Sequence, residues 1–123
     1  MKKLLLIDDD IDSLILSKGW LETKDYEVEL SANAKQTEDI IEYFVPDLVI
    51  IDIHQKDILK YLKDHENTCT APVILMTGYP YTLKYQDLPV DDTIEKPFDL
   101  HQLLKKIKKL TQLKPVQYQL SFA

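Results

Sequence analysis

Residues 4–10 read LLLIDDD, a short apolar run that ends in three carboxylates. Four consecutive apolar residues bounded by charge are typical of a strand buried on both faces. Two more runs follow the same pattern: residues 48–51 precede Asp52, and residues 73–76 precede Thr77. The sequence therefore predicts a sheet whose central strands are covered on both sides.

Segments with a helical period separate these runs. In segment 11–23 the expected core positions are Leu14, Ile15 and Leu21, and in segment 100–110 apolar residues recur at helical spacing after the expected cap Asp99. Asn33 is the expected N-cap of another helix, because a glutamine follows three residues later as in a capping box. The remaining expected elements are strands at 27–31 and 93–95 and helices at 34–45 and 57–66.

The alternation of strands and helices predicts an α/β domain over residues 1–111. We expect a doubly wound, five-stranded parallel sheet with helices on both faces. Residues 78–89 contain two prolines and little periodicity, so the fourth helix is expected to be short or irregular. Residues 112–123 form a C-terminal tail in which apolar and polar residues alternate from Val116. We expect either a frayed terminus or an added strand, on this sheet or on that of a second copy in a homodimer.

The composition is that of one globular domain, with 123 residues, 45% apolar and 29% charged. The net charge is −6 and all fifteen basic residues are lysine, so we expect neither nucleic acid nor a membrane surface as a partner. The sequence contains a single cysteine, Cys69, so an internal disulfide is excluded. No signal sequence or membrane-length apolar run is present, and we expect a soluble cytoplasmic protein.

Residues capable of chemistry stand at the ends of four expected strands: Asp8 and Asp9, Asp52, Thr77, and Lys96. The carboxyl ends of the strands in such a sheet face one crevice, so these side chains should converge. Clustered carboxylates need a cation to stay ionised, and oxygen ligands alone favour Mg²⁺. One carboxylate can then attack a phosphoryl group, whose oxygens a lysine and a hydroxyl can bind.

These residues lie in four motifs that together resemble the response regulator receiver domain over residues 3–110. The motifs are LLLIDDD at 4–10, PDLVIIDI at 46–53, PVILMTG at 72–78 and EKPF at 95–98. The resemblance implies the flavodoxin-like receiver fold and a phosphoacceptor that takes its phosphoryl group from phosphohistidine and then switches partner binding. The implied partners are a histidine kinase or histidine phosphotransfer protein and an unknown target, and the only implied activities are autocatalysed phosphoryl transfer and self-dephosphorylation.

The same resemblance implies a role for each site residue. Asp52 would be the phosphoacceptor, and Thr77 and Lys96 would bind the phosphoryl oxygens. The peptide bond between Lys96 and Pro97 would be cis. Mg²⁺ would be held by Asp8, Asp9, Asp52 and the backbone carbonyl of His54.

Two segments depart from the family pattern. Residues 54–58, directly after the phosphoacceptor, form a shortened loop that lacks the usual proline and glycine. Thr93 occupies the position of the family's switch aromatic, so the usual coupled rotation of a threonine and an aromatic ring cannot run through it. The aromatic residues that could substitute are Tyr79, Tyr81 and Tyr85.

We expect a receiver without an output domain of its own, and two alternatives stay open. The first is a degenerate receiver that docks partners independently of phosphorylation, which the altered loop and Thr93 favour. The second is a small aspartate-nucleophile phosphatase of the haloacid dehalogenase-like class, because an acidic run follows the first strand. That class needs an acidic pair after its lysine, and here only Asp99, an expected helix cap, follows Lys96.

Overall fold

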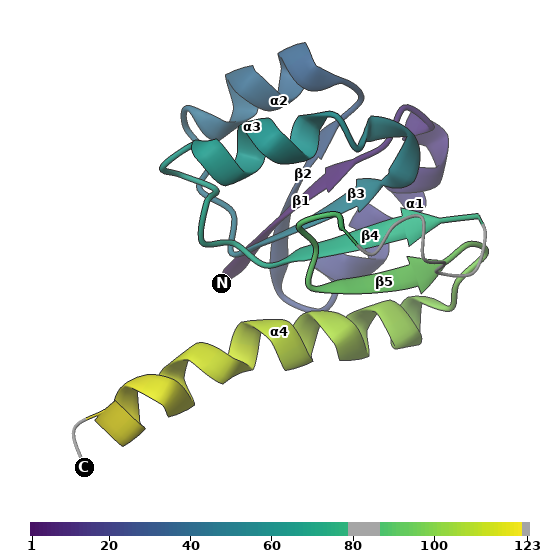
Figure 1. Ribbon diagram of the computed structural model, residues 1–123. Coiled ribbons are helices and arrows are strands. Elements are labelled where there is room, and N and C mark those ends of the chain that lie inside the picture. Colours follow the sequence, from purple (N-terminus) through teal and green to yellow (C-terminus); the bar gives the residue numbers. More distant parts are fainter. Residues whose placement is uncertain (79–86, 122–123) are drawn as a thin grey trace.

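The computed structural model describes residues 1–78 and 87–121, with side chains described as far as Gln112. Five parallel strands form one sheet in the order β2-β1-β3-β4-β5 (Figure 1). This order is that of a flavodoxin-like doubly wound sheet, so the predicted fold class is confirmed. The strands are β1 (Lys2–Ile7), β2 (Tyr26–Ser31), β3 (Leu48–Asp52), β4 (Val73–Thr77) and β5 (Asp92–Glu95).

Helices cover both faces of this sheet. The helical elements are α1 (Ile11–Glu22), α2 (Ala34–Ile41), the single 3₁₀ turn η1 (Ile53–Gln55), α3 (Ile58–Asp64) and α4 (Leu100–Ser121). Apolar residues of α2 and α3 belong to one buried cluster, and those of α1 and α4 belong to the other. Figure 1 shows the two pairs of helices on opposite sides of the sheet.

The strand β1 explains why the apolar runs are uninterrupted. Leu5 and Ile7 lie in the cluster under α2 and α3, whereas Leu4 and Leu6 lie in the cluster under α1 and α4. Successive side chains of a strand point to opposite faces, so both sets must be apolar when both faces are covered. All four side chains are almost completely buried.

Two predicted helix caps are present. The Asn33 side chain accepts a hydrogen bond from the backbone N–H of Gln36 at 2.9 Å, and the Gln36 side chain accepts one from the N–H of Ala32 at 2.7 Å. At α4, the Asp99 carboxylate accepts a hydrogen bond from the N–H of His101 at 2.7 Å. These contacts satisfy backbone donors that have no partner within the first helical turn.

The prediction that Ile15 belongs to the core is wrong. Its exposed fraction is 53%, whereas Leu14, Ser17 and Leu21 are buried. Positions 14, 17 and 21 share one face of α1 at spacings of three and four, and Ile15 lies about 100° away from that face. Apolar residues at 14, 15 and 16 made the buried face ambiguous, and Leu16 is exposed as well.

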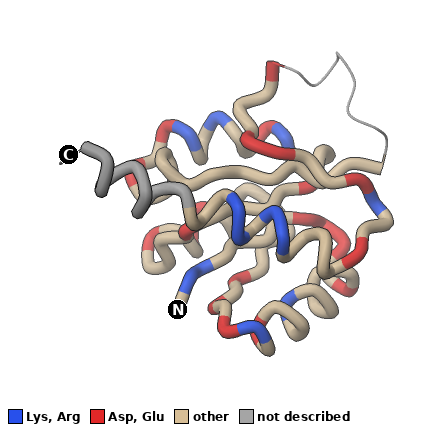
Figure 2. Tube along the Cα trace, turned by 90° about the horizontal axis from the view of Figure 1, so that it is seen from below, with Lys and Arg blue, Asp and Glu red and all other residues tan. Residues whose placement is uncertain are grey.

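The C-terminal segment also differs from the prediction of a strand. Helix α4 continues to Ser121, so the expected boundary at residues 111 and 112 falls inside the helix. Extending an existing helix adds one hydrogen bond for each residue, whereas a strand requires a neighbouring strand. Figure 2 shows basic residues along α4, and of these Lys105, Lys108 and Lys109 are exposed.

The segment between β4 and β5 was expected to contain a short or irregular helix. Residues 79–86, with Tyr79, Tyr81 and Tyr85, lie outside the described residues. Residues 87–91 form turns and bends. Among the helices of the part of the chain that the structure describes, none combines the length and apolar character needed to cross a membrane.

Candidate functional site

The carboxyl ends of β1 and β3 lie side by side in the sheet. Ile7 pairs with Ile51 in the parallel register, so Asp8 and Asp52, each one residue further on, emerge at the same edge. The chain leaves β1 toward β2 on one side, while β3 lies on the other side. Such a reversal of strand order opens the crevice in which doubly wound sheets bind their ligands.

Lys96 joins the two carboxylates. Its ammonium nitrogen Nζ lies 2.7 Å from Asp8 Oδ2 and 2.6 Å from Asp52 Oδ1. Lys96 directly follows β5, its backbone N–H donates to the Thr77 carbonyl at 2.7 Å, and its peptide bond to Pro97 is cis, as expected. Three residues separated by as many as 88 positions of sequence thus form one cluster.

The contacts within this cluster offset the effect of burial on its charged groups. The side chains of Asp8 and Asp52 are only 3% and 4% exposed, and that of Lys96 is 31% exposed. Burial alone would raise the pKa of Asp52, but hydrogen bonds from Lys96 and His54 and the charge of Lys96 outweigh it and hold that pKa below its usual value. Burial would likewise lower the pKa of Lys96, and its bonds to Asp52 and Asp8 raise it instead. Asp52 and Lys96 are therefore both charged at neutral pH.

His54 also contacts the Asp52 carboxylate. Asp52 Oδ2 accepts a hydrogen bond from the His54 backbone N–H at 2.9 Å and lies 2.8 Å from the ring nitrogen Nδ1. The 3₁₀ turn η1 brings the ring back over the end of β3, although the His54 side chain as a whole is 81% exposed. The contact between the His54 ring and the Asp52 carboxylate was not predicted from the sequence. The signal available for it was a polar side chain two residues after an aspartate, a spacing typical of local capping contacts.

The other predicted site residues lie around this cluster. Thr77 is buried at the end of β4, one residue beyond Met76, which pairs with Asp52. Asp9 is exposed, directly after the buried Asp8. The structure therefore brings Asp8, Asp52 and Lys96 into direct contact, with Thr77 on the neighbouring strand and Asp9 at the outer side.

The donor chemistry of the cluster is compatible with a magnesium ion. Mg²⁺ takes oxygen ligands and is held in many sites by one or two carboxylates together with water and phosphate oxygens. Asp8 and Asp52 supply two buried carboxylates that share a single ammonium. Among residues 1–78 and 87–112, however, no group of three or more acidic, histidine or cysteine side chains is arranged to hold a metal ion. Asp8 and Asp52 fit a site in which two carboxylate side chains bind the ion together with backbone, water or phosphate oxygens.

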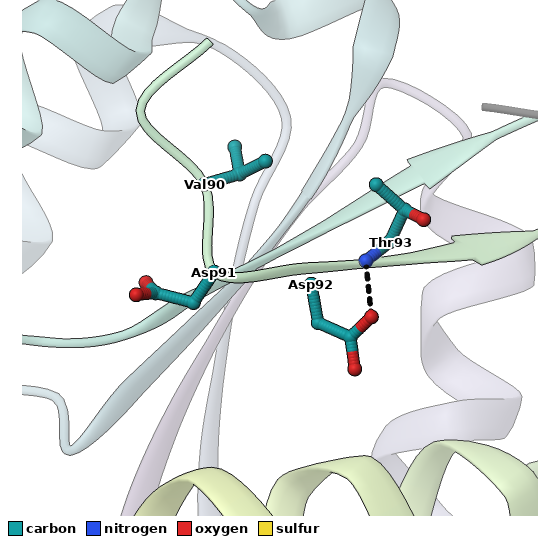
Figure 3. Close-up of a pocket in the computed structure, with 4 residues that line it drawn as sticks. All are labelled: Val90, Asp91, Asp92 and Thr93. Atoms are coloured by element: carbon teal, nitrogen blue, oxygen red, sulfur yellow. Dashed lines mark hydrogen bonds between the residues drawn. The ribbon is translucent and has the colours of Figure 1, made fainter. Parts of the chain in front are cut away.

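Two of the hollows near β5 differ in chemistry. One, of about 440 Å³, is lined mainly by apolar groups and includes Lys96, Pro97, Phe98 and the exposed Leu16 of α1. The other, of about 260 Å³, is lined by Val90, Asp91, Asp92 and Thr93. Figure 3 shows it at the start of β5, with the Asp92 carboxylate accepting from the Thr93 N–H at 2.8 Å. Only the first hollow contains a residue of the carboxylate–lysine cluster.

The chain is similar in sequence to a known protein family and to two regulatory proteins. The family model of the response regulator receiver domain matches residues 4–108. The chain is 31% identical over 111 residues to the nisin biosynthesis regulatory protein NisR of Lactococcus lactis subsp. lactis, covering 86% of this chain and 48% of that protein. It is 30% identical over 113 residues to the transcriptional regulatory protein CpxR of Escherichia coli K12, covering 88% and 48%. The chain thus spans about half the length of these curated relatives.

Solved structures agree in fold. A CheY-like receiver domain protein from Methanospirillum hungatei has 29% identity and a TM-score of 0.81, with 95% of this chain and 98% of that chain covered. The receiver domain of the sensor histidine kinase PA1611 from Pseudomonas aeruginosa, which holds magnesium in its active site cleft, has a TM-score of 0.80 over 90% and 98% of the two chains. At 18% identity, that second likeness shows the fold alone.

These comparisons leave one expectation without support and establish another. The net negative charge of the chain led us to expect that nucleic acid is not a partner. CpxR is a transcriptional regulatory protein, and the similarity to it leaves that expectation without support. The family match covers most of the chain and includes all four motifs that carry Asp8, Asp52, Thr77 and Lys96. The chain belongs to the response regulator receiver domain family, the signalling domains of two-component systems that work with histidine kinases.

Proposed function

We propose that Asp52 accepts a phosphoryl group from a phosphohistidine and that the resulting acyl phosphate changes the affinity of this domain for a partner. The observation that carries the proposal is the bridge from Asp8 through Lys96 to Asp52, with distances of 2.7 and 2.6 Å. A buried carboxylate beside a second carboxylate and an ammonium is a nucleophile in a pocket suited to phosphoryl oxygens.

In the proposed reaction, a carboxylate oxygen of Asp52 attacks the phosphorus of the donor phosphohistidine. The bond between phosphorus and the donor imidazole nitrogen breaks as the new bond to oxygen forms, and the imidazole leaves. Lys96 then pairs with the phosphoryl oxygens in place of the free carboxylate, and the Thr77 hydroxyl donates to one of them. Later attack of water on the acyl phosphate would return the domain to its starting state.

The proposed divalent cation would contribute positive charge to the site. Asp8, Asp9, Asp52 and the backbone carbonyl of His54 are the groups that would hold Mg²⁺, which would supply positive charge to the transferring phosphoryl group. The side chain of Asp8 is already tied to Lys96 and, through Oδ1, to the backbone N–H of Asp10 at 3.0 Å. These two contacts hold Asp8 beside Asp52 before any ion binds.

The proposed partners follow from the same site. The donor would be a histidine kinase or a histidine phosphotransfer protein in the cytoplasm, and the hollow beside Lys96, with the exposed Leu16 on its rim, is a surface on which a donor helix could rest. The target that reads the phosphorylated state would bind elsewhere on the domain, and a homodimer is one form that such a response could take.

Incubation with Mg²⁺ and acetyl phosphate, followed by intact-mass measurement, tests the proposal. We expect a mass gain of one phosphoryl group in the wild type and none in Asp52→Asn. Asp57→Asn is the matched control, because Asp57 is exposed in the same loop and should retain the gain. If the wild type gains no Asp52-dependent mass, the phosphorylation-independent docking module becomes the better description.

A further inference from the structure

The resting Asp52 carboxylate is nearly saturated with hydrogen bonds. Lys96 Nζ donates to Oδ1 at 2.6 Å, and His54 contributes its backbone N–H to Oδ2 at 2.9 Å and its ring nitrogen Nδ1 at 2.8 Å. An ionised carboxylate only accepts hydrogen bonds, so Nδ1 must be the donor. A carboxylate offers about four acceptor positions, and three of them are filled here.

Phosphoryl transfer requires more lone pairs of the Asp52 carboxylate than this arrangement leaves free. One lone pair must attack the phosphorus, and the proposed metal role of Asp52 needs a second one. With about one acceptor position left, at least one of the three hydrogen bonds must open first.

The ring of His54 is the contact best able to open. The backbone N–H of His54 is fixed by the 3₁₀ turn, and Lys96 is held by a second buried carboxylate, that of Asp8. The His54 side chain is 81% exposed, so its ring can turn about the side-chain bonds into water without leaving a buried group unpaired.

We propose that the His54 ring is an intramolecular cap on the phosphoacceptor, which holds Asp52 Oδ2 in the resting domain and must swing away before Asp52 accepts a phosphoryl group. His54 acts here as a positioning residue, since it controls the availability of a carboxylate oxygen and takes no part in bond making. The inference deepens the proposed function and rests on it. It also gives the loop at residues 54–58 a role, because the 3₁₀ turn places the His54 ring over the end of β3.

The resting contact is tested first, without metal or phosphodonor. Nitrogen-15 NMR of the full chain at pH 8 reports which ring nitrogen of a neutral histidine carries the proton. We expect His54 to be protonated at Nδ1 in the wild type and to lose this preference in Asp52→Ala, while His65 and His101 keep the same spectrum in both proteins. A His54 ring that is unaffected by Asp52→Ala overturns the proposal.

The effect on transfer is tested by initial rates of phosphorylation from acetyl phosphate at saturating Mg²⁺, measured by rapid quench so that later hydrolysis does not contribute. We expect His54→Ala to react about fivefold faster than the wild type, as for the release of one exposed hydrogen bond of about 1 kcal/mol. His54→Phe should be accelerated equally, because it keeps a ring of similar size but removes the donor. Gln55→Ala is the control within the same turn and should match the wild type.

The outcomes separate this inference from the function on which it rests. If the wild type, His54→Ala and His54→Phe are phosphorylated at equal rates, the cap is refuted and the phosphoacceptor role of Asp52 stands. If His54→Ala is fast and His54→Phe stays slow, the ring acts by bulk and the hydrogen-bonded cap is refuted. If none of the proteins is phosphorylated, the proposed function fails and the role of the cap in transfer fails with it.

Discussion

Removal of the ammonium between Asp8 and Asp52 should destabilise the domain in a pH-dependent way. In Lys96→Met, a side chain of similar length remains but two carboxylates that are 3% and 4% exposed lose their shared cation. Breaking a fully buried ion pair by removing one partner costs about 3–5 kcal/mol. Lys96 is 31% exposed, so water replaces part of the lost interaction, and we expect the free energy of unfolding to fall by about 2–3 kcal/mol at pH 7 without divalent cations.

The dependence on pH follows from the sign of the pKa shift. Burial raises the pKa of Asp52, yet the bonds to Lys96 and His54 hold it below its usual value in the folded wild type. A carboxyl group whose pKa is lowered by folding stabilises the protein above its usual pKa, and this contribution is lost as the pH falls through the lowered value. The difference between wild type and Lys96→Met should therefore be largest near neutral pH and should shrink below about pH 4.

Urea unfolding followed by circular dichroism at pH 7 and in the acid range measures this difference, provided that the dependence on urea concentration is unchanged. Lys106→Met is the matched control, because Lys106 pairs with Asp92 at 3.2 Å with side chains that are 26% and 30% exposed. That pair should contribute less than about 1 kcal/mol. If Lys96→Met is no less stable than Lys106→Met, or if its deficit persists unchanged in acid, the electrostatic account of the cluster is refuted.

Three further predictions concern the scaffold, and urea unfolding checks each of them. Leu14→Ala should cost about 2–4 kcal/mol whereas Ile15→Ala should cost under about 1 kcal/mol, because Leu14 is 2% exposed and Ile15 is 53% exposed; equal losses would contradict the described face of α1. Asn33→Ala should cost about 1 kcal/mol and Asn33→Gly only a few tenths, since glycine is tolerated at an N-cap; equal effects would argue against a capping role. Thr37→Val should cost about 1–2 kcal/mol because its buried hydroxyl bonds the Ser31 hydroxyl at 2.7 Å, and the double variant with Ser31→Ala should lose less than the sum of the two single changes.

The strands were predictable because covering both faces of a sheet demands uninterrupted apolar runs, and such runs are visible without coordinates. The caps at Asn33 and Asp99 were predictable for a similar reason, since a cap depends on residues only two or three positions away. Ile15 was misplaced because three apolar residues in succession are compatible with more than one buried face of a helix. Of the two alternatives for the segment after Val116, the added strand was wrong, because an alternating pattern carries no information about whether a neighbouring strand is available.

The candidate site could likewise be predicted from the sequence only in part. Its residue types could be inferred because each stands at the end of a predicted strand, and the resemblance of four ordered motifs supplied their expected roles. For the ring contact of His54 the sequence offered only a two-residue spacing as a signal, because the contact itself depends on the 3₁₀ turn that follows Asp52.

Local sequence alone therefore determined which segments are buried strands and which polar groups stand at their ends, because hydrophobic periodicity and capping act over a few residues. Only the tertiary structure decided that β1 lies beside β3 and that the chain returns along β5, which brings Lys96 to within 2.7 Å of Asp8 and 2.6 Å of Asp52. Contacts between residues so distant in sequence arise from the order of strands in the sheet. That order is set by how the whole chain buries its two apolar faces.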